Sequence, residues 1–291
     1  MAKFNTNVQF NIKNYNFNWY SENYWDEDLY QGINERYEGV FYEDILSLNG
    51  FYFNFDDSYY ADYYLGLFGN NITGSIYSGT LSGTITSLHE GFYDAYDAYY
   101  MDWDMIGTSL SASEIRNAIS TSSKSDDLAL FSNALKGNDT IKLSAYDDRM
   151  MGFAGKDTIY GYAGKDTIEG GEGSDRLFGG IGADRLYGGN GADDFVFNDG
   201  ETGKGSSARD IIYDFIKGID DLELSLIDAN SKKSGDQKFD FGGTSAGRND
   251  VWYKKSGSDT IVYGDTNCDG KADFEIELRG VSSLSAGDFI L

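Results

Sequence analysis

Seven aspartates follow one another at intervals of nine residues and form one continuous ladder of carboxylates. An apolar residue stands two positions after each aspartate, and glycine stands two positions before most of them. The adjoining units GYAGKDTIE, GGEGSDRLF, GGIGADRLY and GGNGADDFV fit the pattern GGxGxDxUx, in which U is apolar. This pattern is typical of a calcium-binding parallel β-roll. The candidate metal ligands are Asp139, Asp148, Asp157, Asp166, Asp175, Asp184 and Asp193.

The glycines of the ladder are the second set of candidate residues. Glycine adopts positive φ at little steric cost, so a turn can bring main-chain carbonyl oxygens close to an ion. Aspartate adds a hard carboxylate oxygen, and calcium takes six to eight oxygens at about 2.3–2.6 Å. We therefore expect ligands from the turns around Gly155, Gly164, Gly171, Gly173, Gly180, Gly182, Gly189 and Gly191.

Two nine-residue units make one coil of such a roll, so units eighteen residues apart stack on each other. The pairs expected to share an ion are Asp157 with Asp175, Asp166 with Asp184, and Asp175 with Asp193. The apolar residues point inward and form a thin core. Because that core is small, metal binding would supply much of the folding free energy.

The first two units depart from the pattern. The unit around Asp139 (ALKGNDTIK) has one glycine, and the unit around Asp148 (LSAYDDRMM) has none. Terminal units of a repeat array are usually atypical, so we interpret both as an N-terminal cap. The alternative for the whole ladder, a solvated Gly/Asp-rich linker, is disfavoured by the constant phase of seven units.

A second acidic segment lies near the C-terminal end. Asp265, Asn267, Asp269 and Asp273 resemble the start of an EF-hand loop, but position twelve is Ile276 instead of glutamate. Two interpretations stay open. The segment is either a further calcium site or a β-hairpin turn with solvated acids.

Composition limits the classes of partner. The 291 residues include 23 Lys and Arg against 48 Asp and Glu, a net charge of −25. This charge disfavours nucleic acid, which needs a basic face, and an anionic membrane surface. The single cysteine, Cys268, excludes an intrachain disulfide. No segment reaches the eighteen apolar residues of a membrane span, and residues 1–10 lack the features of a secretory signal peptide.

The pattern along the chain predicts a mostly β protein in three parts. Residues 1–133 are expected to form an antiparallel β domain with a short helical connector, residues 134–196 the parallel β-roll, and residues 197–291 a β cap. Most tyrosines precede residue 101. Exposed tyrosine is common at interfaces, and the alternative is a merely aromatic-rich surface. Strands are expected at 8–12, 15–19, 40–46, 51–55, 63–68, 72–77, 81–88, 210–215, 221–226, 239–241, 251–253, 260–263 and 274–278.

The connector carries helix signals. Ser111 and Glu114 match a capping box, and a second short helix is expected at 127–135.

The repeat from Asp139 to Phe195 resembles the RTX (repeats-in-toxin) family. The stretches DDFVFNDG, ARDIIYDFIKGIDDLELSLIDA, GDTNCDGKADFEIELRG and SLSAGDFIL are similar to the C-terminal domain of serralysin-type proteins. The resemblance covers about residues 134–291. It implies a calcium-binding β-roll with a cap, and an uncleaved type I secretion signal that ends in Asp288-Phe289-Ile290-Leu291. It therefore implies export from a Gram-negative cell by the type I secretion machinery, with folding on external calcium.

No catalytic set stands out beside the ladder. Serralysin-type proteases carry HExxH, whereas His89 is the only histidine here, so that activity is excluded. His89 is also a candidate haem ligand, although a lone histidine is more often structural. The G-x-S-x-G match at 243–247 is followed by a strand-like segment instead of a helix, which favours a glycine-rich turn. Carboxylate pairs for glycoside hydrolysis stay open.

The sequence therefore predicts a secreted, calcium-dependent structural or adhesive protein without catalysis of its own. The aromatic domain would assemble copies into a surface layer, matrix or filament, or bind a surface glycan, and residues 5–19 would pair with the sheet edge of a neighbour. One alternative is an enzyme acting on polysaccharide or polyester, with its site in residues 20–110. Another is a module that captures haem or sugar.

Overall fold

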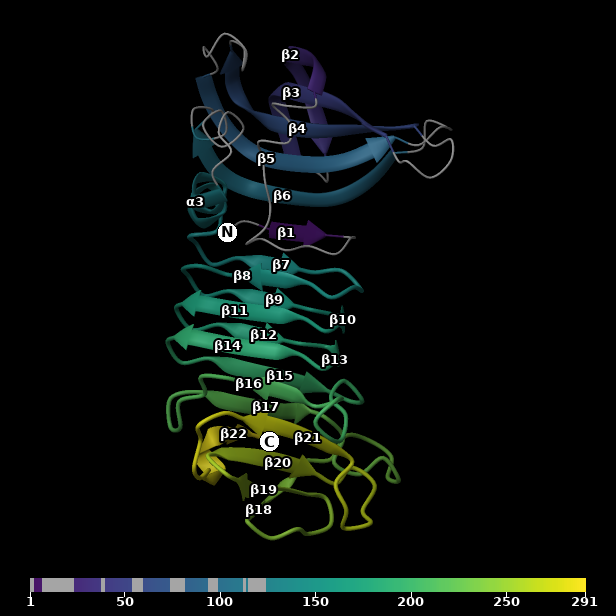
Figure 1. Ribbon diagram of the computed structural model, residues 1–291, viewed down its shortest axis with the longest axis vertical. Coiled ribbons are helices and arrows are strands. Elements are labelled where there is room, and N and C mark those ends of the chain that lie inside the picture. The colour runs from purple at the N-terminus through teal and green to yellow at the C-terminus, as the bar shows by residue number, and fades with distance from the viewer. Residues whose placement is uncertain are drawn as a thin grey trace. The chain divides into compact units, whose positions relative to one another are not determined.

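The computed structural model describes residues 3–6, 24–37, 40–53, 60–73, 82–93, 99–111, 114 and 124–291, with side chains at 110, 111, 114 and 128–291. The chain divides into two compact units, Met1–Gly137 and Asn138–Leu291. Strands dominate both units, which confirms the mostly β class (Figure 1). None of the helices in the described ranges is long and apolar enough to cross a membrane.

The first unit is an antiparallel meander to which one early strand is added. Strands β2 to β6 each pair with the next, and β1 pairs antiparallel with β6, which gives the order β2-β3-β4-β5-β6-β1. The antiparallel arrangement confirms the prediction for this part of the chain. The strands are β1 Lys3–Thr6, β2 Tyr24–Tyr37, β3 Val40–Phe53, β4 Tyr60–Thr73, β5 Ser82–Tyr93 and β6 Tyr99–Ser111.

The strands of this unit are longer than the sequence predicts. Residues 40–46 and 51–55 were expected as two strands, but they join in β3, because Asn49 and Gly50 are paired within the ladder and do not form a turn. The prediction missed strands β2 and β6. The sequence of β2 has no clean apolar alternation, whereas in β6 Met101, Trp103 and Met105 alternate with Asp102 and Asp104, which was a readable signal. The expected strands at 8–12 and 15–19 lie outside the described residues.

The described residues of the connector, Glu114 and Lys124–Ala134, are helical, as predicted. The main-chain N–H of Glu114 donates to Ser111 Oγ at 3.3 Å, and the N–H of Ser111 donates to a Glu114 carboxylate oxygen at 2.7 Å. These reciprocal bonds are those of a capping box. Helix α3, Lys124–Ala134, covers most of the helix expected at 127–135.

The second unit is a roll of two sheets whose rungs follow chain order (Figure 1). One sheet is parallel throughout and has the order β7-β9-β12-β15-β17-β22. Its strands are β7 Thr140–Lys142, β9 Thr158–Tyr160, β12 Arg176–Phe178, β15 Asp194–Asn198, β17 Asp221–Leu226 and β22 Phe289–Ile290, the last preceded by the 3-10 turn η1 Ala286–Asp288.

The facing sheet has the order β8-β11-β14-β16-β21-β20-β19-β18. It is parallel up to β21, after which β21, β20 and β19 pair antiparallel. The cap strands thus continue the sheets of the roll, and the cap strands predicted from 210 onward are confirmed. The strands are β8 Arg149–Met151, β11 Thr167–Glu172, β14 Arg185–Asn190, β16 Asp210–Ile212, β18 Asp240–Gly243, β19 Asp250–Ser256, β20 Asp259–Gly264 and β21 Phe274–Leu278, beside a short pair formed by β10 Ala163–Gly164 and β13 Ile181–Gly182.

The core between the two sheets is a stack of single apolar side chains. In every unit of the ladder the residue two positions after the aspartate is buried, from Ile141 to Phe195. Pairing continues the stack into the cap, where Leu222 lies beside Phe195 and Ile212 beside Leu186. The predicted inward direction of these residues is therefore confirmed, and it places each aspartate at the end of a strand, where the chain turns.

Candidate calcium-binding site

The aspartates of the ladder stack in two columns with a repeat of eighteen residues. The main-chain N–H of each aspartate donates to Oδ1 of the aspartate one coil later, at 2.7–2.9 Å. The stacking of the three predicted pairs is confirmed, and the degenerate units join the same columns. The contacts run from Asp139 to Asp157, Asp148 to Asp166, Asp157 to Asp175, Asp166 to Asp184, and Asp175 to Asp193.

The second carboxylate oxygen of each regular unit is buried without a hydrogen-bond partner. This holds for Oδ2 of Asp157, Asp166, Asp175, Asp184 and Asp193, none of which is more than 1% exposed. Burial raises the pKa of Asp157 to about 7, of Asp166 to about 8, and of Asp184 and Asp193 to about 6, against the ordinary 3.8. An unpaired buried charge is costly. A cation bound to these oxygens would offset that cost.

The first glycine of each unit makes room for that cation. A methyl group built on Gly170 would lie 2.5 Å from Asp175 Oδ2 and 2.6 Å from the carbonyl oxygen of Gly188, one coil later. The Cα face of this glycine thus borders a space lined by carboxylate and carbonyl oxygens. The corresponding residues of the other units are Gly152, Gly161, Gly179 and Gly188, and each borders Oδ2 of its own aspartate. The sequence interpretation missed all five, although a glycine five residues before each aspartate was a readable signal.

The predicted glycines serve the course of the turn. Gly155, Gly164, Gly173 and Gly191 have positive φ, as do Gly171, Gly180 and Gly189 in the second position of their units. Gly182 has no positive φ, but a methyl group on it would meet the carbonyl oxygen of Gly164. Phe153 and Tyr162 hold the second position in earlier units with φ of 71° and 67°, a conformation that glycine adopts with less strain.

The donor set fits calcium. In the part of the chain with described side chains, no three His, Cys, Asp or Glu side chains converge as a metal cluster. Main-chain carbonyl oxygens lie beside the carboxylates at the glycine turns, as Gly188 O does at Gly170, and could contribute further oxygen ligands. Oxygen-only ligands and a flexible count of them suit calcium. Because Oδ1 already accepts an N–H, the aspartates of the five regular units, Asp157, Asp166, Asp175, Asp184 and Asp193, each have one uncommitted oxygen, Oδ2, for an ion.

One end of each column is closed by protein donors. Oδ2 of Asp148 accepts hydrogen bonds from the main chain and hydroxyl of Ser144. The second column, which contains Asp193, is closed at its C-terminal end. There Asp220 Oδ1 accepts the N–H of Asp193 at 3.1 Å, and Asp220 Oδ2 accepts the N–H of Ile216 at 2.7 Å. Asp220 therefore continues the column without leaving an oxygen for a cation.

Asp210 continues the other column, and the sequence interpretation missed it. Its Oδ1 accepts the N–H of Asp184 at 2.8 Å, its Oδ2 is buried without a partner, and burial raises its pKa to about 8. Asp210 follows Asp184 by 26 residues, so an inserted loop takes it out of the nine-residue phase. The signal that remained was the apolar Ile212 two positions later.

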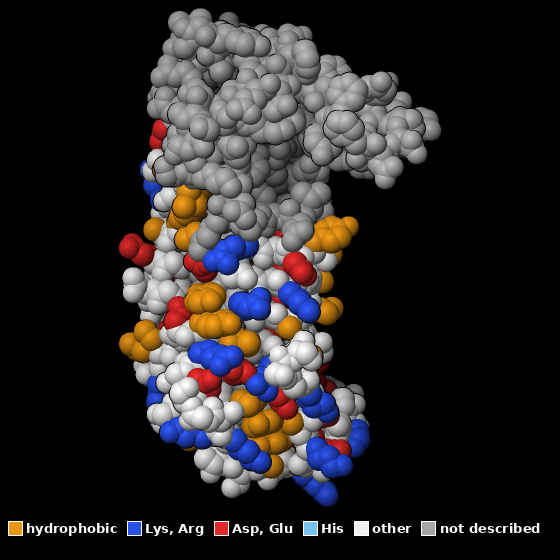
Figure 2. All heavy atoms as spheres, viewed as in Figure 1, with side chains coloured by type: hydrophobic (Ala, Val, Ile, Leu, Met, Phe, Trp, Pro, Cys, Tyr) orange, Lys and Arg blue, Asp and Glu red, His pale blue; other side chains and the backbone are white. Residues whose placement is uncertain are grey.

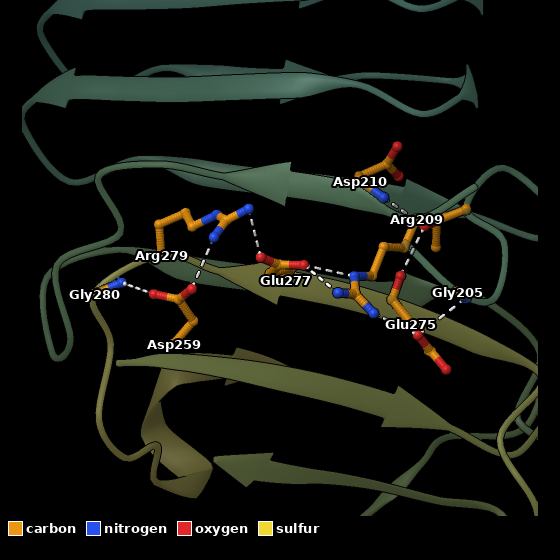
Figure 3. Close-up of polar contacts among 9 residues, drawn as sticks. Gly205, Arg209, Asp210, Asp259, Glu275, Glu277, Arg279 and Gly280 are labelled. Carbon is orange, nitrogen blue, oxygen red and sulfur yellow. Dashed lines mark hydrogen bonds and ion pairs between the residues drawn. The ribbon is translucent and has the colours of Figure 1, made fainter. Parts of the chain in front are cut away.

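A charged network holds the strand that carries Asp210 (Figure 3). Arg209 pairs with Glu275 at 2.9 Å and with Glu277, and Arg279 links Glu277 to Asp259 at 2.9 Å each. The Arg209 side chain is 13% exposed, so the pairs are shielded from solvent. Arg209 thus anchors β16 on β21 while its neighbour Asp210 turns inward toward Asp184.

The second acidic segment forms the loop of the β20–β21 hairpin. Asp265 accepts main-chain N–H groups of Asn267, Asp269 and Gly270, which lower its pKa although burial raises it. Asp273 accepts from Thr266 and from the Asn267 amide. The loop is therefore held by its own donors, and a cation at Asp265, Asn267, Asp269 and Asp273 stays a prediction.

For two further candidates from the sequence, His89 and Ser245, the structure gives only their position in the fold. His89 lies in β5, opposite Gly66 and Asp104 in the neighbouring strands. Ser245 lies in the turn between the parallel strands β18 and β19, so the turn interpretation of 243–247 fits and the helix of a nucleophile elbow does not follow. On the face of the second unit in Figure 2, Lys and Arg side chains are scattered among acidic and apolar ones and do not form one basic patch.

Comparison with known proteins identifies the same repeats. The family model of the RTX calcium-binding nonapeptide repeat matches residues 134–168, 160–195 and 169–202. Residues 134–202 are therefore RTX repeats, and their ligand is Ca²⁺. The resemblance of the repeat to the RTX family and the predicted ion are confirmed. No curated protein matches the chain.

Solved structures share the repeat part. The AlgE6R3 subunit of the Azotobacter vinelandii mannuronan C5-epimerase is 26% identical over 53% of this chain and 78% of that one, with a TM-score of 0.29. The AlgE6R2 subunit is 25% identical over 50% and 89%, also at 0.29. The extracellular lipase LipA from Serratia marcescens is 16% identical over 71% of this chain, which spans 29% of the lipase, at 0.36.

Proposed function

We propose that this chain is a secreted, calcium-dependent structural or adhesive protein. The second unit is its folding switch, and the first unit makes the contacts between copies or with a surface glycan. In this proposal the chain leaves a Gram-negative cell unfolded through the type I secretion machinery. It then folds where calcium is abundant.

The buried Oδ2 oxygens of the two aspartate columns are the observation that supports the switch. Without a cation they must be protonated or remain as unpaired charges, and either state costs free energy at neutral pH. Calcium removes that cost and binds only the folded turns, so binding stabilises the fold by mass action. A cell interior poor in calcium would leave the chain unfolded, and the outside would fold it.

The strand content of the first unit supports an assembling role. A sheet built from long strands offers unpaired main-chain groups at its edges, and such edges recruit strands from other chains. The proposed partners are copies of this chain and a surface glycan. The alternatives, an enzyme acting on polysaccharide or polyester and a module that captures haem or sugar, rest on the sequence alone.

Light scattering on the full chain tests the proposal. Particle size is measured over a range of protein concentrations in millimolar calcium, in magnesium and with a chelator. Large particles in calcium that dissolve on chelation are expected. Magnesium is the control, because it prefers rigid octahedral sites and keeps its waters. A monomer in calcium throughout this range would refute the assembling role.

A further inference from the structure

Three loops of the cap, called the basic loops below, carry exposed cations. They connect β17 to β18 (227–239), β18 to β19 (244–249) and β20 to β21 (265–273). Figure 2 shows basic side chains at the lower end of the second unit, the end formed by β18 and β19. Among the residues with described side chains, none forms an ion pair with these cations. They are Lys232, Lys233, Lys238, Arg248 and Lys271, all exposed.

Hydrogen bonds join the basic loops to one another. Ser231 donates its main-chain N–H and its hydroxyl to the carbonyl oxygen of Thr266, at 2.9 and 3.0 Å. Asn249 donates its N–H to Asp265 Oδ2 at 3.4 Å and its side-chain amide to the carbonyl oxygen of Ala229. The cations thus come from segments far apart in sequence and are brought together only in the folded cap.

Most acidic residues of the basic loops are used inside them. Asp265 is buried, and Asp228 and Asp273 are half-buried. All three accept main-chain N–H groups of their own loops, at 2.8–3.3 Å. The exposed carboxylates of these loops are those of Asp236 and Asp269. The surface of the basic loops therefore has more cations than carboxylates, in a chain whose net charge is −25.

The first unit carries the opposite charge. Residues 1–137 contain 19 Asp and Glu against 6 Lys and Arg. Among the described strands, β2 lies at the end of its sheet, with β3 on one side. Three consecutive residues of this edge strand, Asp26, Glu27 and Asp28, are acidic and lie opposite residues 47–49 of β3. The chain thus has an acidic sheet edge in one unit and the basic loops in the other.

We propose that the basic loops of one copy bind the acidic β2 edge of a second copy. The inference rests on the proposed assembling function and names its contact. The two surfaces belong to different units, so the contact is heterologous and the molecules join head to tail. Complementary charge steers such an encounter and fixes its register.

This contact makes assembly depend on calcium. The cap continues the sheets of the roll, through the pairing of β14 with β16 and of β15 with β17, so calcium that folds the roll also orders the cap. Without calcium the basic loops are not held together, and the excess of negative charge keeps copies apart. The folded chain gathers its cations where an acidic edge can meet them.

Reversing the charge on each surface tests the contact in the full chain. The loop variant carries Lys232→Glu, Lys233→Glu and Lys238→Glu, and the edge variant carries Asp26→Lys, Glu27→Lys and Asp28→Lys. Each variant alone brings like charges together, so the protein concentration at which particles appear in light scattering should rise at least about tenfold. An equimolar mixture should form particles again, because each variant then meets opposite charge on the other.

A third variant controls for net charge. It reverses three exposed cations outside the basic loops, Lys142→Glu, Lys217→Glu and Lys255→Glu, and should assemble like the wild type. Circular dichroism of every variant should show the same calcium-induced β signal, because none of the changes touches the aspartate columns.

Salt and an anionic glycan distinguish other origins of the particles. About 1 M NaCl shortens the Debye length to about 3 Å, so the particles should dissolve while the β signal remains. Polygalacturonate is the probe for the other candidate partner of a basic surface, an acidic glycan.

The outcomes separate this contact from assembly in general. Particles in the mixture that neither variant forms alone are the expected result, and a contact within one chain cannot produce them. Wild-type particles that charge reversal and salt leave unchanged would overturn the contact and leave assembly standing. A loop variant that assembles normally but no longer binds polygalacturonate would overturn it in favour of the glycan. A wild type that stays monomeric at every concentration would overturn both the contact and the assembling function.

Discussion

The substitution Asp166→Asn should reverse the sign of its effect when calcium is added. Asparagine keeps the shape of the side chain and an oxygen that accepts the Asp148 N–H, now 2.8 Å from Asp166 Oδ1. It replaces the buried, unpartnered Oδ2 by a neutral amide group. The variant therefore removes a charge without removing the link between the coils.

The magnitude follows from the pKa of this carboxyl. Burial raises it from 3.8 to about 8, and each unit corresponds to about 1.4 kcal/mol. At pH 7 the calcium-free roll thus loses at most on the order of 4 kcal/mol to this group, which asparagine does not lose. With calcium at a thousand times its Kd, one site stabilises the folded roll by about 4.1 kcal/mol, so above that concentration the loss of the site outweighs the gain from removing the charge. We expect Asp166→Asn to stabilise the calcium-free roll and destabilise the loaded roll.

Hydrogen exchange of peptides from the roll, measured in the full chain with and without calcium, reads both effects. A calcium titration followed by circular dichroism should show a weaker dependence of folding on calcium for the variant, because one ion fewer binds on folding. Asp194→Asn is the matched control, because Asp194 lies outside the columns and faces Arg176 at 3.7 Å. If both variants had the same calcium dependence, the assignment of Oδ2 as a ligand would be wrong.

Three further predictions concern the same columns. Raised carboxyl pKa values mean that the folded state binds protons more tightly than the unfolded state, so with chelator present the β signal should be strongest below about pH 4 and fall as the pH rises from there through 6–8. A β signal independent of pH would contradict this. Gly170→Ala should weaken calcium binding at least tenfold by titration, because its methyl group would lie 2.5 Å from Asp175 Oδ2, whereas Gly287→Ala meets nothing closer than 3.9 Å. Equal calcium affinities of the two variants would refute the placement of Gly170 beside the ion. Asp210→Asn should reduce the calcium bound per chain in equilibrium dialysis by one ion, whereas Asp220→Asn, whose Oδ2 accepts an N–H, should not; an unchanged count for both would remove Asp210 from the site.

The roll was predictable because its physics is periodic. A nine-residue phase fixes which residue turns, which points inward and which stacks eighteen positions away, so the aspartate pairs and the apolar core follow from spacing alone. The first glycines of the units were missed because the prediction considered glycine only as a residue that adopts positive φ. Gly170 is needed for space instead, which becomes evident only when the next coil is in place.

The remaining differences arise where periodicity ends. Asp210 joins its column through pairing of β14 with β16, a contact between segments whose separation in sequence is not a multiple of nine. The meander strand β2 (YWDEDLYQGINERY) has no clean alternation, so its pairing with β3 decides its conformation. Tertiary pairing routinely overrides such local patterns.

The C-terminal residues connect the proposed export to the fold. Asp288 is fully buried. Its carboxylate accepts the N–H of Gly218 at 2.8 Å and bonds from Ser285, and Phe289 pairs with Leu222 of the roll. If residues 288–291 are the export signal that the RTX resemblance implies, folding hides the signal from the exporter.

Calcium inside the producing cell should therefore reduce export. Raising it is expected to lower the secreted fraction of the wild type, because the roll folds and β22 docks on β17. Asp166→Asn, whose calcium-free roll is the more stable, should be retained at calcium levels that still allow export of the wild type, and Asp194→Asn should be exported like the wild type. Equal export of all three chains at every calcium level would show that the exporter reads the tail whether or not it is docked.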